Sequence, residues 1–259
     1  MKPRNFFLLA ALVAALFLPP VIRASQSDQV QSATSSERRA GIAFTDDFEA
    51  PGLDAWQLPF PEDWEILSQS GNRYLHMKRN REPAVPRRPV QFALRKSLNV
   101  GSFDFHARVR REGRSMIVVF NYGDGLHFYY AHLSKDRGTT QPVHNGVFLV
   151  NNAPRVRIAG LEAPPALPDT EWHRIRIARD VASGRISVWS DVQTGPLFTV
   201  VDRTFTCGAI GIGSFDETGD FDDVALESND AGCAPRPVAG IVPADHSHHG
   251  RCSKDLSQP

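Results

Sequence analysis

Cysteine is scarce in this chain, and only one long apolar run is present, near the amino terminus. The 259 residues include three cysteines, which allow at most one internal disulfide and leave one thiol over. No stretch after Leu18 is long and apolar enough to cross a bilayer. No helical period recurs along the sequence, which argues against an α-helical fold.

An excess of charge of either sign is also absent. The chain has 29 basic and 29 acidic residues. If residues 1–24 are removed, Lys2, Arg4 and Arg23 go with them, and 26 basic and 29 acidic residues remain. A net charge near −3 argues against a broad nucleic-acid-binding surface.

The amino terminus has the order of a secretory leader. Lys2 and Arg4 precede an apolar run over Phe6–Leu18, and small and polar residues follow near Ala24. This order predicts a signal peptide that ends at Ala24. The alternative is a membrane anchor, but about 13 apolar residues are too few to span a bilayer. We therefore expect a soluble, secreted or periplasmic protein without a transmembrane segment.

Composition divides the rest of the chain into three parts. Residues 25–41 are rich in Ser, Gln and charge, which indicates a disordered tether. Residues 42–228 can build one core of ordinary domain size. Residues 229–259 form a tail with Pro, His and Cys but no apolar period. We expect a monomer with no organic cofactor.

The tail leaves two questions open. Cys233 could pair with Cys207, which would tie the tail to the last hairpin, or with Cys252, which would close a loop inside the tail; the second pairing is favoured. The segment Asp245–His249 could bind zinc, copper or nickel. A solvated tail is the favoured alternative.

The middle of the chain alternates between apolar and polar residues, with breaks at Gly, Pro, Asn and Asp. This pattern predicts about 13 strands and an all-β, two-sheet antiparallel jelly-roll sandwich. The predicted strands cover 42–48, 64–69, 74–78, 90–95, 103–110, 115–121, 126–132, 146–150, 172–179, 185–190, 197–201, 209–214 and 221–226.

The predicted hairpin over 172–190 has one apolar face. Ile175 and Ile177 share that face, so Trp172 and the arginines between them point the other way, as does Trp189 on the returning strand. Two indoles beside several guanidinium groups suggest a sugar-stacking surface. The favoured alternative is that the arginines cover the Trp rings by cation–π contact.

A second mixed surface is expected from the middle strands. By alternation, His106 and Arg108 lie on the face opposite Phe103 and Phe105. If the strands over 103–132 are neighbours in one sheet, the sequence predicts a polar and aromatic patch suited to a sugar, with a solvated sheet face as the alternative. The patch comprises His106, Arg108, Asn121, His127 and Tyr129.

Several segments carry a family resemblance. The segments are DDF (46–48), FYYAHL (128–133), HNGVFLVN (144–151), WHRIRIARD (172–180), SGRISVW (183–189) and GAIGIGSFDETGDFDDVAL (208–226). Together they resemble bacterial exported domains of the concanavalin A-like lectin/glucanase superfamily. More narrowly, they are similar to laminin-G-like and family-16-like domains, including the 3-keto-disaccharide hydrolase group. The resemblance covers nearly all of 42–228 and implies the fold more strongly than any activity.

The resemblance implies two kinds of site. Related glucanases carry a Glu-x-Asp-x-Glu strand, which this sequence lacks, so no retaining carboxylate pair is predicted. Jelly-roll lyases and keto-sugar enzymes instead use His or Tyr with Arg or Asn, and the residue types are present in Arg108, His127, Tyr129, His132, His144 and Asn145. By alternation, His132 lies on the opposite face from Tyr129.

Members of this superfamily often hold a structural calcium between the first and last strands. Asp47 and Asp223 are the carboxylates that the resemblance assigns to it. The alternative is that these acids are solvated turn residues. The leading hypothesis is an exported carbohydrate-recognising module whose partner is a polysaccharide or oligosaccharide. The alternatives are a lyase or hydrolase of modified sugars and an adhesion domain.

Overall fold

The structure, a computed structural model, describes residues 41–229 and 232–234. The expected leader, the tether before Gly41, the His-rich segment and Cys252 lie outside the described residues. Among the described residues, no helix combines the length and the apolar character that crossing a membrane requires.

The described residues form fifteen strands and one short 3-10 helix, Pro61–Asp63. All thirteen predicted strands are present, with their ends shifted by a few residues. Two strands were not predicted: β2 has only two residues, and β10 has no buried residue to alternate with exposed ones. The strands are β1 Ile42–Asp46, β2 Trp56–Gln57, β3 Trp64–Gln69, β4 Asn72–Met77, β5 Gln91–Arg95, β6 Phe103–Arg111, β7 Ser115–Asp124, β8 His127–Ser134, β9 Gly146–Asn151, β10 Val156–Ala159, β11 His173–Asp180, β12 Arg185–Ser190, β13 Phe198–Val201, β14 Ala209–Ser214 and β15 Gly219–Ser228.

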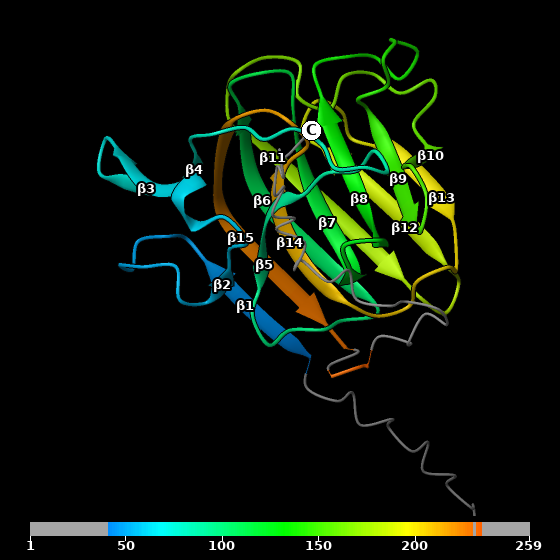
Figure 1. Ribbon diagram of the computed structural model, residues 1–259, viewed down its shortest axis with the longest axis horizontal. Helices are drawn as coiled ribbons and strands as arrows, with labels where there is room; N and C mark the ends of the chain where they lie inside the picture. The colour runs from blue at the N-terminus through cyan, green and yellow to red at the C-terminus, as the bar shows by residue number, and fades with distance from the viewer. Residues whose placement is uncertain (1–40, 230–231, 235–259) are drawn as a thin grey trace, which may run out of the picture. The chain divides into compact units, whose positions relative to one another are not determined.

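These strands make two stacked antiparallel sheets. Sheet A has the order β13-β12-β11-β6-β15-β4-β3, with β1 also paired to β15, and sheet B has the order β10-β9-β8-β7-β14-β5-β2. Figure 1 shows β7, β8 and β9 in one layer and β11 and β12 in the other. The predicted all-β jelly-roll sandwich is confirmed.

Alternation places the core between the sheets. In β6, Phe103, Phe105, Ala107 and Val109 are buried, and the residues between them are partly or fully exposed. Ile175 and Ile177 of β11 are buried in the same cluster. The other face of sheet A, called here its outer face, therefore carries the polar side chains of β6 and β11.

The outer face of sheet B is closed. Phe92, Phe128, Tyr130 and Phe148 form a second apolar cluster there, and each is at most 4% exposed. The segment between β4 and β5 runs across this face (Figure 1), where Arg87 O accepts a hydrogen bond from the backbone of the β9–β10 loop. A ligand on a sheet face must therefore use sheet A.

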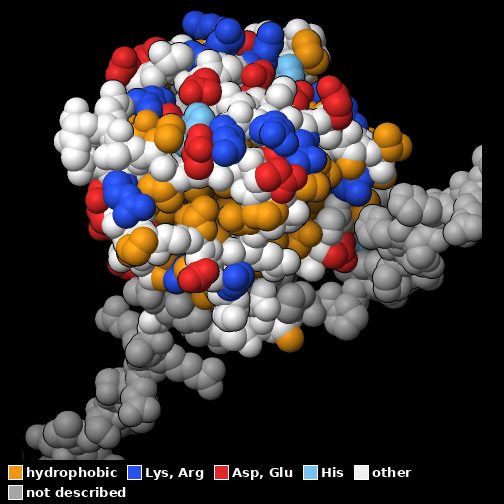
Figure 2. Space-filling model, turned by 60° about the vertical axis from the view of Figure 1, so that its left-hand side comes forward, with side chains coloured by type: hydrophobic (Ala, Val, Ile, Leu, Met, Phe, Trp, Pro, Cys, Tyr) orange, Lys and Arg blue, Asp and Glu red, His pale blue; other side chains and the backbone are white. Residues whose placement is uncertain are grey.

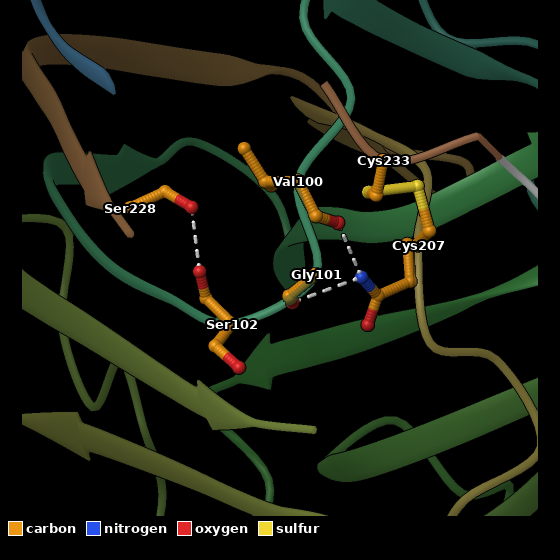
Figure 3. The surroundings of a disulfide bond; sticks show 7 residues. Val100, Gly101, Ser102, Cys207, Ser228 and Cys233 are labelled. Carbon is orange, nitrogen blue, oxygen red and sulfur yellow. Dashed lines mark hydrogen bonds between the residues drawn. A yellow bond between two sulfur atoms is a disulfide. The ribbon is translucent and has the colours of Figure 1, made fainter. Parts of the chain in front are cut away.

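A disulfide covalently links the two sheets at one end. It joins Cys207, just before β14, to Cys233, which follows β15 (Figure 3). Beside it, Ser228 Oγ donates a hydrogen bond of 2.7 Å to Ser102 O. The favoured Cys233–Cys252 pairing is wrong, because the end of β15 brings Cys233 directly to the start of β14.

Candidate functional site

The predicted patch around His106, Arg108 and Tyr129 does not form, because its strands belong to different sheets. β6 lies in sheet A, whereas β7 and β8 lie in sheet B. His106 and Arg108 lie on the outer face of sheet A as predicted, but Tyr129 is buried in the core between the sheets. Alternation predicts the face of each residue on its own strand, but it does not identify the neighbouring strands.

Tyr129 and His127 share a side, and both are buried. The Tyr129 hydroxyl donates to a carboxylate oxygen of Asp202 and accepts a 3.0 Å hydrogen bond from the backbone N–H of Phe205. Burial raises the pKa of Tyr129 to about 12, so the phenol stays protonated. His127 Nδ1 lies 2.8 Å from Asp124 Oδ1. Both side chains are therefore buried among contacts within the protein and are not presented to a ligand.

His132 lies on the opposite face from Tyr129, as predicted, and forms a closed cluster with Ser115 and Arg155. His132 Nε2 lies 2.7 Å from Ser115 Oγ, and Arg155 Nη1 lies 3.1 Å from Nδ1. A guanidinium can only donate, so Nδ1 accepts and Nε2 carries the proton that it donates to Ser115. Because His132 therefore cannot take a proton from Ser115, the pair is not a nucleophile and its base.

Three further candidates also have structural partners. Asn121 donates to the backbone oxygens of Val100 and Gly101, at 2.9 and 3.3 Å. Asn145 accepts from Ser134 N and donates to Pro164 O. His144 is buried 3.3 Å from an Asp136 oxygen. Their burial corrects the prediction that these three residues bind a sugar.

The outer face of sheet A instead presents an aromatic group between β4 and β11. The half-buried ring of Trp172 has the guanidinium carbons of Arg108 and Arg110 at 4.8 and 4.7 Å from its centroid. Tyr74 meets Trp172 edge to face, with ring centroids 5.6 Å apart. A depression of about 240 Å³ opens here. We call it the Trp172 site; its lining residues are Gln69, Ser70, Asn72, Tyr74, Arg108 and Trp172.

Fixed polar groups surround the Trp172 site. Asp222 Oδ2 accepts from Asn72 Nδ2 at 3.0 Å and from Arg108 Nη1 at 3.3 Å. Burial raises the pKa of the Asp222 carboxyl. Arg110 donates to Asp220 at 2.6 Å and to Gln69 at 3.2 Å. The site thus places amide and guanidinium donors beside two aromatic rings, a combination that suits the hydroxyls and the apolar face of a sugar.

Of the predicted site residues, only Arg108 lines this depression. His106 lies two residues further along β6 on the same face. Sequence reasoning had placed Trp172 on an exposed face and expected arginines of its own hairpin to cover the ring, but the arginines that contact it belong to β6. It missed Tyr74, Asn72 and Gln69, because their position depends on the pairing of β4 with β15.

A larger depression lies elsewhere and lacks an aromatic platform. It measures about 430 Å³ and lies near Gly41, where β6 begins and β11 and β15 end. Its one aromatic residue, Phe103, is buried in the core. We therefore assign no sugar site there.

The two acids predicted to bind calcium do lie together. Asp47 and Asp223 line a depression of about 290 Å³ with Asp46. Asp46 already accepts a 2.7 Å hydrogen bond from Trp56 Nε1, and Asp223 lies 3.4 Å from Arg108 Nη1. Within the described part of the chain, no three His, Cys, Asp or Glu side chains converge as metal ligands. These side chains alone do not complete a calcium shell, which needs further backbone or water oxygens.

Comparison with known proteins identifies the fold and nothing narrower. No protein-family model matches the chain, and no curated protein matches it in sequence. The GH43 protein BlXynB of Bacillus licheniformis is 13% identical with a TM-score of 0.52, over 71% of this chain and 39% of that one. A Parabacteroides distasonis protein with the provisional description of a glycosyl hydrolase is 14% identical with a TM-score of 0.50, over 71% and 99%.

A third solved structure has a slightly lower TM-score than these two. The carbohydrate-binding module CBM66 of Bacillus subtilis is 15% identical with a TM-score of 0.49, over 67% of this chain and 96% of the module. Identities this low show the fold alone. The chain therefore has a two-sheet antiparallel jelly-roll fold that is similar to the folds of the Bacillus licheniformis and Parabacteroides distasonis proteins.

Proposed function

We propose that this protein is an exported carbohydrate-recognising module that binds sugar on the outer face of sheet A. The observation that carries the proposal is the Trp172 site, where a half-buried indole and Tyr74 meet fixed donors on an otherwise polar face. The apolar face of a pyranose stacks on an aromatic ring, and its hydroxyls bond to the surrounding polar groups. The leader predicted at 1–24 supports export.

The distribution of charge favours a neutral sugar over a polyanion. Arg108 and Arg110 are each bound to an aspartate at the Trp172 site. On the side of the molecule shown in Figure 2, basic and acidic side chains are interspersed and do not segregate by sign. A polyanion needs a continuous basic surface, so we expect neutral glycans to bind.

A glycan array followed by calorimetry tests the proposal. We expect Trp172→Ala to weaken binding of the selected glycan by about tenfold or more, because truncating an aromatic anchor costs about 2 kcal/mol. Leu161→Ala is the control, since Leu161 is 58% exposed and does not line the site. Unchanged affinity in Trp172→Ala would contradict the assignment, as would the absence of any bound glycan on the array.

The same glycans distinguish binding from catalysis. The wild-type protein is incubated with a polysaccharide panel, and new reducing ends and unsaturated uronates are measured. We expect none, because the His and Tyr candidates are buried with structural partners. Cleavage that is lost in His127→Ala or Tyr129→Phe would instead establish the lyase or hydrolase alternative.

Calcium at Asp47 and Asp223 remains a separate proposal. It is supported by the shared depression and by the pairing of β1 with β15, which brings the two acids together. A bound ion stabilises the folded state by mass action, so calcium should raise the Tm and a chelator should reverse the rise. Asp47→Asn with Asp223→Asn should abolish the effect. A wild-type Tm that is unaffected by calcium or chelator would reject the site.

A further inference from the structure

A second aromatic and ionic cluster lies on the same outer face of sheet A. Arg176 stacks over Trp189 with its guanidinium carbon 4.6 Å from the ring centroid. The same guanidinium binds both carboxylate oxygens of Asp104, at 2.8 and 2.5 Å, and His106 Nε2 lies 3.0 Å from that carboxylate. We call this group the Trp189 cluster; its members are Asp104, His106, Arg176 and Trp189.

Strand register shows that the Trp189 cluster shares its face with the Trp172 site. Arg176 is directly opposite Trp189 of β12 on one side and His106 of β6 on the other. Residues that are directly opposite in a sheet point to the same face. Arg108 is two residues beyond His106 and also points to that face. β6 and β11 therefore run through both groups.

The indoles of the two groups are separated by more than the length of one sugar ring. Trp172 lies just before β11, and Arg176 is four positions further along that strand. At about 3.3 Å per residue, these positions span roughly 13 Å. A monosaccharide stacked on Trp172 cannot also reach Trp189, whereas an extended oligosaccharide that lies along β6 and β11 can contact both.

The side chains of the Trp189 cluster are accessible and held in place. His106 and Arg176 have 54% and 44% of their side chains exposed, and Trp189 is half-buried. The bidentate pair with Asp104 fixes the orientation of Arg176 before any ligand arrives. Fixed, exposed polar groups beside an indole reduce the entropy lost on binding.

We propose that the outer face of sheet A binds a glycan chain of several sugar units, with one unit at the Trp172 site and another at the Trp189 cluster. This inference rests on the proposed function and specifies its ligand as a chain that lies parallel to β6 and β11. The Trp172 site binds short and long ligands alike. The Trp189 cluster contributes only when the ligand is long enough to reach it.

Calorimetry against neutral oligosaccharides of one type, from a monosaccharide to a hexasaccharide, tests the proposal. Wild-type affinity should rise with chain length. Trp189→Ala should keep the short-ligand affinity and lose about tenfold with the hexasaccharide, and Trp189→Phe should restore most of the loss. Trp172→Ala should weaken binding at every length.

Each outcome has a distinct meaning. If Trp189→Ala binds the hexasaccharide as tightly as wild type, Arg176 merely shields the indole and the second contact is rejected. An equal loss at all lengths would also reject it. If the wild type binds no oligosaccharide, or Trp172→Ala changes nothing, the proposed function itself fails. Thermal unfolding of each variant confirms that the sandwich is intact.

Discussion

Buried arginines organise the loops of this protein by donating to backbone carbonyls. Arg111 donates to Leu167 O and Pro168 O at 2.8 and 2.9 Å, and Arg179 binds the carbonyls of Gly184 and Asp202 at 2.6 and 2.9 Å. Burial lowers the pKa of Arg111 and of Arg179. These carbonyls all lie outside the strands, and each guanidinium connects two of them. Sequence reasoning could not predict this role, because arginine is usually exposed.

For single residues of the candidate site, too, the sequence predicted only part of what the structure shows. Alternation correctly predicted that Trp172, His106 and Arg108 point away from the core. It could not show that His132 and Tyr129 would be fully buried, because both faces of β8 are covered. A strand buried on both faces can contain polar residues if each has a partner, and such partners are distant in sequence.

His132 should make the protein sensitive to mild acid. Burial, and then the charges of Arg155 and His144, hold the pKa of His132 well below 6.5. The unfolded chain binds the proton at about pH 6.5, so stability is complete above that pH and falls as the pH drops below it. The loss from this group approaches about 1.4 kcal/mol per pH unit.

Urea unfolding between pH 7 and pH 5 measures this effect. His132→Gln should flatten the decline in the free energy of unfolding, although the variant is less stable at pH 7. His106→Gln is the matched control, because His106 is exposed on sheet A. His144, whose pKa burial also lowers, contributes part of the remaining slope. An identical slope in wild type and His132→Gln would contradict the assignment.

At the scale of elements, strand content was predictable and strand order was not. Alternation identified every strand of four residues or more except β10. The neighbours of β6 are β11 and β15, which begin 62 and 108 residues after the last residue of β6. Pairing over such separations depends on how the whole chain packs, so the sequence alone did not place Tyr74 beside Trp172.

The disulfide should contribute measurably to the stability of these elements. It closes a loop with a sequence separation of 26 residues, for which the chain-entropy relation gives about 3.5 kcal/mol. Cys207→Ala with Cys233→Ala should lower the free energy of unfolding in urea by about that amount. Cys252→Ala should leave it unchanged. Equal stability of the double variant and the wild type would show that the bond is dispensable.

At the scale of the whole molecule, the two sheets have different roles. Sheet B is covered on both faces, by the core on one and by the β4–β5 segment on the other. Sheet A packs on one face only and presents indoles and paired ions on the other. The sequence predicted the fold, Arg108 as a site residue and the exposed face of Trp172. The placement of β6 in one sheet and of β7 and β8 in the other, which rules out the predicted patch, required the structure.

The most direct test of glycan recognition observes the indoles themselves. The chain has four Trp residues, so a nitrogen–proton NMR spectrum contains four indole signals, and the Trp172→Phe variant identifies that of Trp172. On titration with the selected glycan, we expect the Trp172 signal to move and those of the buried Trp56 and Trp64 to stay. A glycan that binds while the Trp172 signal remains fixed would contradict the account.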